Sequence, residues 1–289
     1  MVPLRREVIE TPDGDELVLD HLDADGRAEA GPTFVLLHGL EGSSQSVYIQ
    51  GVLAAIRRHG HRAVAINFRS CARDPRSLFR TLPNRRPRFY HSGETEDFDF
   101  VVRRLAAEGH RLVAFGASLG GNVILKWLGE HPGQKLITAA ATISVAYDLH
   151  AAGAYLESRA GRFYVGRFLS TLKKKVVKVV KDFPELQGKV NIPLALRATT
   201  FREFDDAATA PIHGFADADD YYRRASSIFY LDRITTPTLC ISAEDDPFLP
   251  REVLVRAKRV ASPSVEFRTT SSGGHVGFIS GRAPWSPVY

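Results

Sequence analysis

The chain has 289 residues, of which 44% are hydrophobic and 25% charged, and its formal net charge is +5. These values are typical of one globular α/β domain, and the apolar runs fall short of the roughly 20 residues that a membrane helix needs. The N-terminal segment lacks the apolar core of a signal peptide, so we expect a cytoplasmic protein. The basic residues gather in two clusters, NRRPR and KKKVVKVVK, without a nucleic-acid-binding motif, which argues against a nucleic-acid partner.

The two cysteines, Cys71 and Cys240, lie in different predicted elements. No Cys-x-x-Cys or Cys/His spacing accompanies them, so the sequence indicates neither a disulfide framework nor a zinc site. We expect each to be a small buried residue. No metal and no organic cofactor are predicted.

Predicted strands and helices alternate along most of the chain. Residues 4–26 indicate a hairpin around a Pro-Asp-Gly turn. Apolar runs predict strands and 3.6-residue periodicity predicts helices. The strands are expected within 32–44, 61–70, 111–118, 135–148, 236–246 and 264–272, and the helices within 46–60, 94–109, 120–131 and 251–262. This alternation predicts an α/β fold with a doubly wound, mostly parallel sheet.

The alternation breaks between about residues 150 and 227, a stretch rich in Arg, Lys, Phe and Tyr without a clear buried strand. We interpret residues 1–289 as a single domain in which 150–227 form a mainly helical, cap-like insertion. It is expected over the carboxyl ends of the strands, where open α/β sheets bind ligands. Its aromatic residues are candidates for a substrate pocket, although each one also suits ordinary packing. They include Phe163, Tyr164, Phe168, Phe201, Phe204, Phe215, Tyr221 and Tyr222.

Within the insertion, valines flanked by lysines over Lys173–Lys181 indicate an amphipathic helix. A solvated surface helix is the simpler interpretation. The alternative is a weak contact with a membrane surface or an anionic lipid.

Gly116-Ala117-Ser118-Leu119-Gly120 matches the pattern Gly-x-Ser-x-Gly, and it follows a predicted buried strand and opens a predicted helix. A serine on such a sharp turn projects its hydroxyl freely, and the flanking glycines allow neighbouring chain segments to approach. Ser118 is therefore a candidate nucleophile. The alternative is a helix N-cap beside glycines that merely pack. A phosphate-binding loop is disfavoured because its Lys-Ser/Thr pair is missing.

A serine nucleophile needs a base, and in this architecture an acid and then a histidine follow it along the chain. His275 follows the last predicted strand between glycines, and Asp246 follows the strand before it. Asp246 is preferred as the acid because it lies four residues before Pro250, while Asp245 remains an alternative. Four other histidines are weaker candidates for the base because they lie near helix ends or surface turns, namely His59, His61, His110 and His131.

A tetrahedral intermediate also needs hydrogen-bond donors for its oxyanion. The expected donors are the backbone N–H groups of Leu119, just after the serine, and of Leu40 in the loop HGLEGSS. His38 begins this loop and is expected to shape it rather than to act as a second base.

Several stretches together resemble the α/β-hydrolase superfamily and, within it, the YheT-type esterases, which are bacterial relatives of the ABHD1 and ABHD3 proteins (AB hydrolase 4 family). They are LLHGLEGSS, INFRSC, NRRPRFYHSGETED, FGASLGGN, AEDDPFLP and GGHVGF, spread over residues 36–278. The resemblance implies that Ser118, Asp246 and His275 form a charge-relay triad. It also implies hydrolysis of carboxylic esters, with lipid esters among the substrates.

Two departures from the family pattern are expected to matter. ARDPRSLFRTLP forms a longer loop before NRRPR, which predicts a different pocket rim. Only fourteen residues follow His275, where the family continues into a closing helix. We expect the lack of this helix to expose sheet surface.

The predicted function is a serine esterase that forms an acyl-enzyme on short- to medium-chain or lipid esters. An acyltransferase or thioesterase with the same triad is the first alternative. A non-catalytic protein that binds lipid surfaces is the second. A dehalogenase or epoxide hydrolase is disfavoured because those enzymes carry an aspartate where this chain has Ser118.

Overall fold

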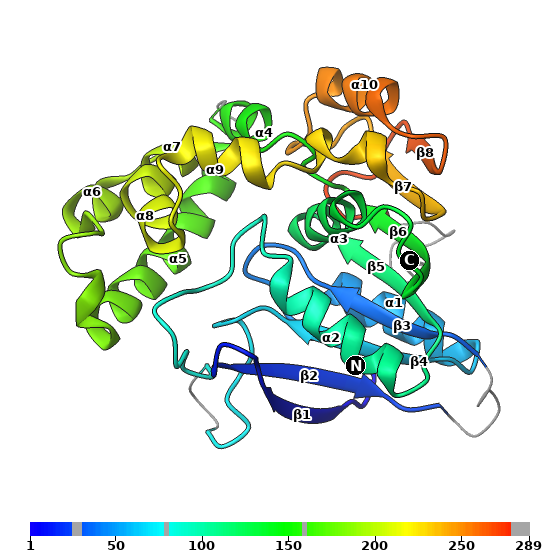
Figure 1. Cartoon of the computed structure of the whole chain (residues 1–289). Coiled ribbons are helices and arrows are strands. Elements are labelled where there is room, and N and C mark those ends of the chain that lie inside the picture. Colours follow the sequence, from blue (N-terminus) through cyan, green and yellow to red (C-terminus); the bar gives the residue numbers. More distant parts are fainter. Residues whose placement is uncertain (25–30, 78–80, 158–160, 279–289) are drawn as a thin grey trace.

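The computed structural model describes residues 1–24, 31–77, 81–157 and 161–278. An eight-stranded sheet runs through this part of the chain in the order β1-β2-β4-β3-β5-β6-β7-β8 (Figure 1). Its strands are β1 (Arg5–Glu10), β2 (Glu16–Leu22), β3 (Thr33–Leu37), β4 (Arg62–Asn67), β5 (Leu112–Ala117), β6 (Ile137–Ile143), β7 (Thr238–Ala243) and β8 (Val265–Thr270).

The N-terminal strands depart from an otherwise parallel sheet. β1 pairs antiparallel with β2 and β2 antiparallel with β4, whereas each later pair is parallel. The hairpin closes where the Thr11 N–H donates to the Asp15 carbonyl over 2.9 Å. Gly14 in this turn has φ 79°, a conformation that glycine adopts without steric cost. The predicted α/β fold with a doubly wound, mostly parallel sheet is confirmed.

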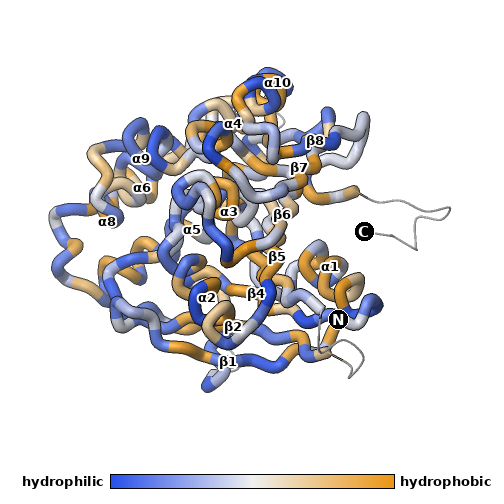
Figure 2. The backbone as a smooth tube through the Cα atoms, turned by 45° about the vertical axis from the view of Figure 1, so that its right-hand side comes forward, coloured by the Kyte–Doolittle hydropathy of each residue, from blue (hydrophilic) through white to orange (hydrophobic). Residues whose placement is uncertain are grey.

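Helices cover both faces of the sheet because its central strands are apolar on both sides. On one face, Ile49 and Leu53 of α1 pack against Leu36 of β3. Within the described residues three helices cover the opposite face, and Figure 2 shows hydrophobic residues concentrated along the strands between these layers. The helices are α1 (Val47–Arg58) and, on the opposite face, α2 (Glu96–Ala107), α3 (Leu119–Glu130) and α10 (Arg251–Val260).

Between β6 and β7 the described chain forms helices that gather beyond one end of the sheet (Figure 1). They have a hydrophobic core of their own, which includes Val176 and Phe204 and extends to Phe248, just after β7. A π-helical turn at Asp205–Thr209 lies among them. The helices are α4 (Leu149–Leu156), α5 (Arg162–Asp182), α6 (Ile192–Arg197), α7 (Phe201–Phe204), α8 (Ala210–His213) and α9 (Ala218–Ala225).

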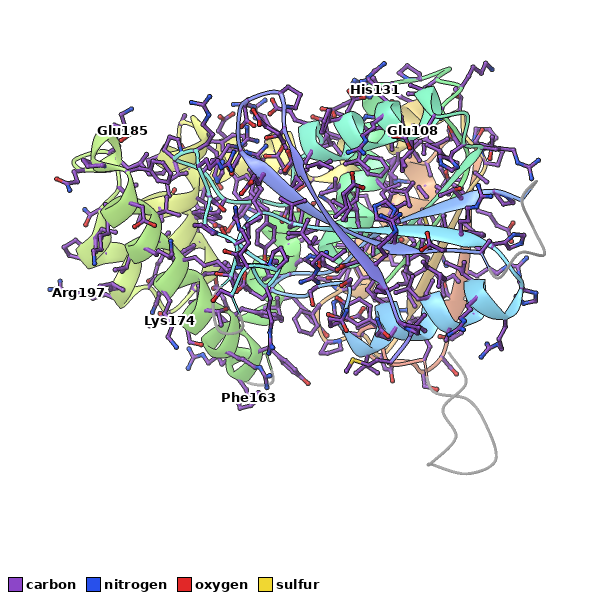
Figure 3. The ribbon with its side chains drawn as sticks, turned by 90° about the horizontal axis from the view of Figure 1, so that it is seen from below. Glu108, His131, Phe163, Lys174, Glu185 and Arg197 are labelled. Atoms are coloured by element: carbon purple, nitrogen blue, oxygen red, sulfur yellow. The ribbon has the colours of Figure 1, made fainter. Side chains whose placement is uncertain are left out.

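The lysine-rich stretch lies on α5, whose apolar face packs into the insertion. Val176, Val179 and Val180 are buried, whereas Lys174 is exposed and points away from the body of the molecule (Figure 3). Among the described helices, none combines the length and apolar character that crossing a membrane requires.

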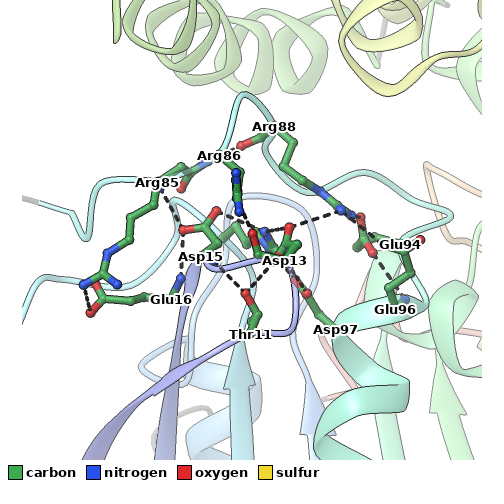
Figure 4. A network of polar contacts seen from close by, with 12 residues as sticks. Thr11, Asp13, Asp15, Glu16, Arg85, Arg86, Arg88, Glu94, Glu96 and Asp97 are labelled. Atoms are coloured by element: carbon green, nitrogen blue, oxygen red, sulfur yellow. Dashed lines mark hydrogen bonds and ion pairs between the residues drawn. The ribbon is translucent and has the colours of Figure 1, made fainter. Parts of the chain in front are cut away.

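An ionic network fastens the loop before α2 to the N-terminal hairpin (Figure 4). The Arg69 side chain is 2% exposed and its guanidinium binds Asp13, Asp15 and Asp97. In the loop, the Arg85 N–H donates to Asp15 over 2.9 Å. The neighbouring arginines add further bonds, from Arg85 to Glu16, from Arg86 to the Asp13 carbonyl, and from Arg88 to Glu94 and Glu96. The segment that follows this network, residues 89–92, lies beside α3, where the Asn122 amide donates to the Ser92 carbonyl over 2.8 Å.

Both predicted departures from the family pattern touch residues outside the described part of the chain. Residues 78–80 belong to the loop expected to alter the pocket rim, and residues 279–289 to the stretch in which a closing helix is expected to be missing.

Candidate active site

Ser118 occupies the sharp turn between the end of β5 and the start of α3. Its backbone has φ 52° and ψ −118°, a strained conformation for a residue with a side chain. The residue holds the N-cap position, yet its hydroxyl makes no capping bond to α3. Its own N–H donates to the Ile143 carbonyl over 2.8 Å, which ties the turn to β6. The hydroxyl is therefore free for another partner.

The glycines around Ser118 permit close contact between backbone segments. A Cβ atom at Gly120 would lie 2.5 Å from the Leu37 carbonyl oxygen of β3. One at Gly116 would lie 2.6 Å from the Gly120 carbonyl oxygen, across the turn itself. These distances are below any normal contact, so a side chain at either position would push α3 away from the sheet and change the direction of Ser118.

His275 connects the serine to a buried carboxylate. Its Nε2 lies 2.9 Å from the Ser118 Oγ. Its Nδ1 lies 3.0 Å from both Asp246 carboxylate oxygens, and Asp246 is 2% exposed. An ionised carboxylate only accepts hydrogen bonds, so the ring proton belongs on Nδ1 and Nε2 is left to accept from the serine hydroxyl.

The loop that carries His275 is held on both sides of the histidine. The Gly274 N–H donates to Asp245 over 2.8 Å, and the Val276 N–H donates to the Ser144 hydroxyl over 3.2 Å. Asp246 thus contacts the imidazole of His275, whereas Asp245 accepts from the backbone N–H of the neighbouring Gly274. The Phe248 ring lies over the imidazole, with centroids 4.1 Å apart.

The loop after β3 brings a second backbone segment to the serine. A Cβ atom at Gly39 would lie 3.2 Å from the Ser118 Cβ. Residues 39–42 form a turn closed by the Gly42 N–H on the Gly39 carbonyl at 3.0 Å, and Glu41 within it has φ 56°. Within the described residues, the N–H groups of Leu40 and Leu119 have no acceptor. Leu40 and Leu119 both line the cavity beside Ser118.

His38 has both ring nitrogens engaged inside the loop. The Phe68 N–H donates to its Nε2 over 3.1 Å, so its Nδ1–H donates to the Gly39 carbonyl over 2.7 Å. Burial lowers the pKa of His38 to about 4 and keeps the ring neutral at physiological pH. This residue fixes the loop and has no free nitrogen for a substrate.

A cavity of about 490 Å³ opens beside Ser118 and His275. From the insertion, its lining includes the predicted aromatics Phe168, Phe201, Phe204, Tyr221 and Tyr222. Within the described residues, the other three predicted aromatics do not line it, and Phe163 is 73% exposed (Figure 3). Sequence reasoning missed the aromatic residues that other segments contribute, which are Tyr48, Phe89, Tyr90 and Phe248.

Asp205 is a buried carboxyl group in the cavity wall that the sequence did not indicate. It accepts from the Tyr222 hydroxyl over 2.8 Å and from the Thr209 hydroxyl over 2.5 Å. Burial raises its pKa to about 7. A buried carboxyl without a basic partner has no sequence signature, because the fold alone creates its surroundings.

Both cysteines are free thiols, and Cys240 is buried as expected, whereas Cys71 is only partly buried. Within the described residues neither of them lines the cavity. In the described part of the chain, His, Cys, Asp and Glu side chains form no cluster that would hold a metal ion.

This chain is similar to known hydrolases in sequence and in fold. Residues 32–282 match the alpha/beta hydrolase fold family. YheT of Escherichia coli, a protein named as an esterase, is 39% identical over 277 residues, which cover 94% of this chain and 78% of YheT. The mouse phospholipase ABHD3 is 32% identical over 295 residues, covering 100% of this chain and 69% of ABHD3. An esterase of Pyrococcus furiosus superposes with a TM-score of 0.59 at 19% identity, covering 95% of this chain and 84% of that structure.

Proposed function

The chain belongs to the α/β-hydrolase family, in the group of YheT and ABHD3, and we propose that this carboxylic ester hydrolase acts through Ser118, His275 and Asp246. The observation that carries the proposal is the continuous hydrogen-bonded path from the Asp246 carboxylate through the His275 ring to the Ser118 hydroxyl. A serine hydroxyl is weakly nucleophilic until an adjacent base accepts its proton, and this path supplies the base.

In the first half-reaction the Ser118 Oγ attacks the ester carbonyl carbon while His275 Nε2 takes its proton. Asp246 stabilises the resulting imidazolium and keeps the ring in the required tautomer. The carbonyl oxygen becomes an oxyanion, which the N–H groups of Leu40 and Leu119 stabilise as donors already in place. Cleavage of the bond between the carbonyl carbon and the alcohol oxygen follows. The alcohol leaves with the proton from His275, and Ser118 retains the acyl group.

The second half-reaction returns the enzyme to its starting state. His275 accepts a proton from water as the water oxygen attacks the acyl carbonyl carbon, and the same two N–H groups stabilise the second oxyanion. The bond to the Ser118 Oγ then breaks. The serine recovers its proton from His275, and the carboxylic acid is released.

The cavity supports esters with a substantial apolar part as substrates. Its volume of about 490 Å³ lies within the range of roughly 300–1,000 Å³ that is typical of small-molecule sites. Its aromatic lining suits a short or medium acyl chain or the apolar portion of a lipid ester. The similarity to a phospholipase agrees with lipid esters, and this choice of substrate is part of the proposal.

Turnover of p-nitrophenyl esters, from acetate to decanoate, tests the proposal. Wild type is expected to hydrolyse the series and Ser118→Ala to lose the activity, because within the described residues the Ser118 hydroxyl is the one that contacts His275 Nε2. Ser170→Ala is a matched control, since Ser170 is exposed on α5 outside the cavity lining. Equal rates for wild type and Ser118→Ala would contradict the proposal.

A further inference from the structure

One lysine of α5 turns inward toward the loop after β3. The Lys175 Nζ donates to a Glu41 carboxylate oxygen over 2.5 Å and to the Cys71 sulfur over 3.3 Å. It also lies 5.0 Å from the centre of the Tyr90 ring. Lys174, its neighbour in sequence, is exposed and points outward. α5 therefore places the positive charge of Lys175 against the loop after β3.

Glu41 occupies a demanding position in the turn of residues 39–42. Its φ of 56° lies in the left-handed region, and glycine or asparagine is favoured at the third position of turns with such a φ. A non-glycine residue keeps this conformation only where its surroundings hold it. Tyr90 stabilises this conformation of Glu41 through two hydrogen bonds. The Glu41 N–H donates to the Tyr90 hydroxyl over 2.6 Å, and the hydroxyl donates to the Glu41 carboxylate over 2.7 Å.

Lys175 supplies the charge that this arrangement needs. The side chains of Glu41 and Lys175 are only 13% and 17% exposed. Burial raises the pKa of the Cys71 thiol to about 11, so the thiol stays neutral and Glu41 is the charged partner of the lysine. Without the ammonium group, the carboxylate would be left largely desolvated and would be driven toward solvent. Glu41 would then tend to leave its left-handed conformation.

The turn held in this way carries the N–H group of Leu40. The hydrogen bond from the Glu41 N–H to the Tyr90 hydroxyl fixes the Leu40–Glu41 peptide. On the other side of Leu40, the Gly39 N–H donates to the Tyr48 hydroxyl over 2.8 Å. A change at Glu41 therefore alters the direction of the Leu40 N–H relative to the Ser118 Oγ. Lys175 itself does not line the catalytic cavity within the described residues, so a direct contact with substrate is not needed to connect it to catalysis.

We propose that Lys175 is a positioning residue: its ion pair with Glu41 fixes the turn that presents the Leu40 N–H to the oxyanion. The helical insertion thereby contributes to the chemistry at the sheet edge as well as to the pocket. This inference rests on the proposed function, because an oxyanion forms only if Ser118 attacks a carbonyl group.

Steady-state kinetics with p-nitrophenyl butyrate test the inference, with Lys174→Met as the matched control. Misplacing one oxyanion donor costs less than removing it, so we expect Lys175→Met to lower kcat about 10- to 100-fold. KM is expected to stay within about twofold, since the effect arises in the transition state. Lys175→Arg keeps the charge and is expected to lose only about fivefold. Lys174→Met is expected to match wild type.

A double-mutant cycle separates the ion pair from general packing. If Lys175 acts through Glu41, the variant that combines Lys175→Met with Glu41→Gln should be about as slow as the slower single variant. Circular dichroism and thermal unfolding verify that each variant is folded. If Lys175→Met fails to fold, Glu41→Gln carries the test, because it retains the shape of the side chain and is expected to show the same loss of kcat.

The outcomes distinguish the two proposals. Unchanged kcat in folded Lys175→Met, or in Glu41→Gln where that variant carries the test, would overturn the inference and leave the proposed function intact. A raised KM with unchanged kcat would also overturn it, because Lys175 would then affect only substrate binding. Wild type that neither hydrolyses an ester nor reacts with a fluorophosphonate would overturn the proposed function, and the inference with it.

Discussion

The sheet edge and the helical insertion contribute to the site in different ways. Ser118, Asp246 and His275 follow β5, β7 and β8, so the order of the strands brings them together. Part of the cavity wall comes from side chains of α5, α7 and α9, whose places depend on how these helices pack. The comparison teaches that backbone topology brings the proposed triad together, whereas side-chain packing shapes the cavity beside it. Changes at the sheet edge should therefore abolish turnover, and changes to the aromatic side chains of the insertion should alter its selectivity.

The largest effect is expected from His275→Ala. Loss of the base should lower kcat by about 10⁴- to 10⁶-fold, as in other serine hydrolases with a triad. Because the two residues act as a unit, combining His275→Ala with Ser118→Ala should cost little more than either change alone. Kinetics with p-nitrophenyl butyrate measure both effects, and losses that multiply would argue against a shared role.

Asp246→Asn, compared with Asp245→Asn, tests which of the two adjacent aspartates orients His275. An amide would favour the wrong imidazole tautomer, so we expect kcat to fall by about 10⁴-fold. Asp245→Asn is the matched neighbour. In the described residues its side chain accepts from the Gly274 N–H, and the amide oxygen of Asn can still accept this bond, so a loss of no more than about tenfold is expected. A larger loss in Asp245→Asn than in Asp246→Asn would reverse the assignment of the acid.

These assignments could be made from the sequence because they depend on backbone pattern. A glycine-flanked serine after a buried strand, and an acid and a histidine after later strands, mark positions that an α/β sheet brings to one edge. The same pattern predicted the order of strands and helices, and the fold class is confirmed. Asp245 and Asp246 are adjacent in sequence, and the sequence favoured Asp246 without excluding Asp245.

The insertion was less predictable because its aromatic side chains depend on helix register. Phe163 and Phe168 lie on the same helix, five residues apart, and therefore point in different directions at 3.6 residues per turn. Phe168 lines the cavity and Phe163 is exposed. The positive φ of Glu41 and the burial of Asp205 were also beyond the sequence, since both arise from tertiary contacts.

Truncation of an aromatic residue in the insertion is expected to affect selectivity. Phe201→Ala removes part of the cavity wall and should lower kcat/KM for the decanoate ester about 10-fold or more, because apolar contact area is lost. Activity on the acetate ester should change about twofold at most. Phe163→Ala, which removes an exposed ring on the same group of helices, should affect neither ester. Equal losses on both esters in Phe201→Ala would show that Phe201 acts on the chemistry and not on selectivity.

The smallest effect is expected from the pH dependence of stability at Asp205. Burial raises its pKa in the folded state from 3.8 to about 7, so the folded protein holds this proton more tightly than the unfolded chain. The resulting stabilisation is present below about pH 4 and is lost as the pH rises through about 7. Asp205→Asn removes this dependence, and its Tm relative to wild type should rise by a few degrees, about 3 °C or more, between pH 5 and pH 8. A constant difference in Tm across this range would show that Asp205 does not titrate there.

The central claim is that Ser118 is the nucleophile activated by His275 and Asp246, and trapping the acyl-enzyme tests it most directly. Acid quenching of wild type during turnover of p-nitrophenyl butyrate, followed by tryptic digestion, should yield a butyryl adduct on the peptide of residues 112–126. Ser118 is the only hydroxyl-bearing residue in that peptide. The account predicts this adduct in wild type and its absence in Ser118→Ala. Turnover with the acyl group on another peptide would contradict the account.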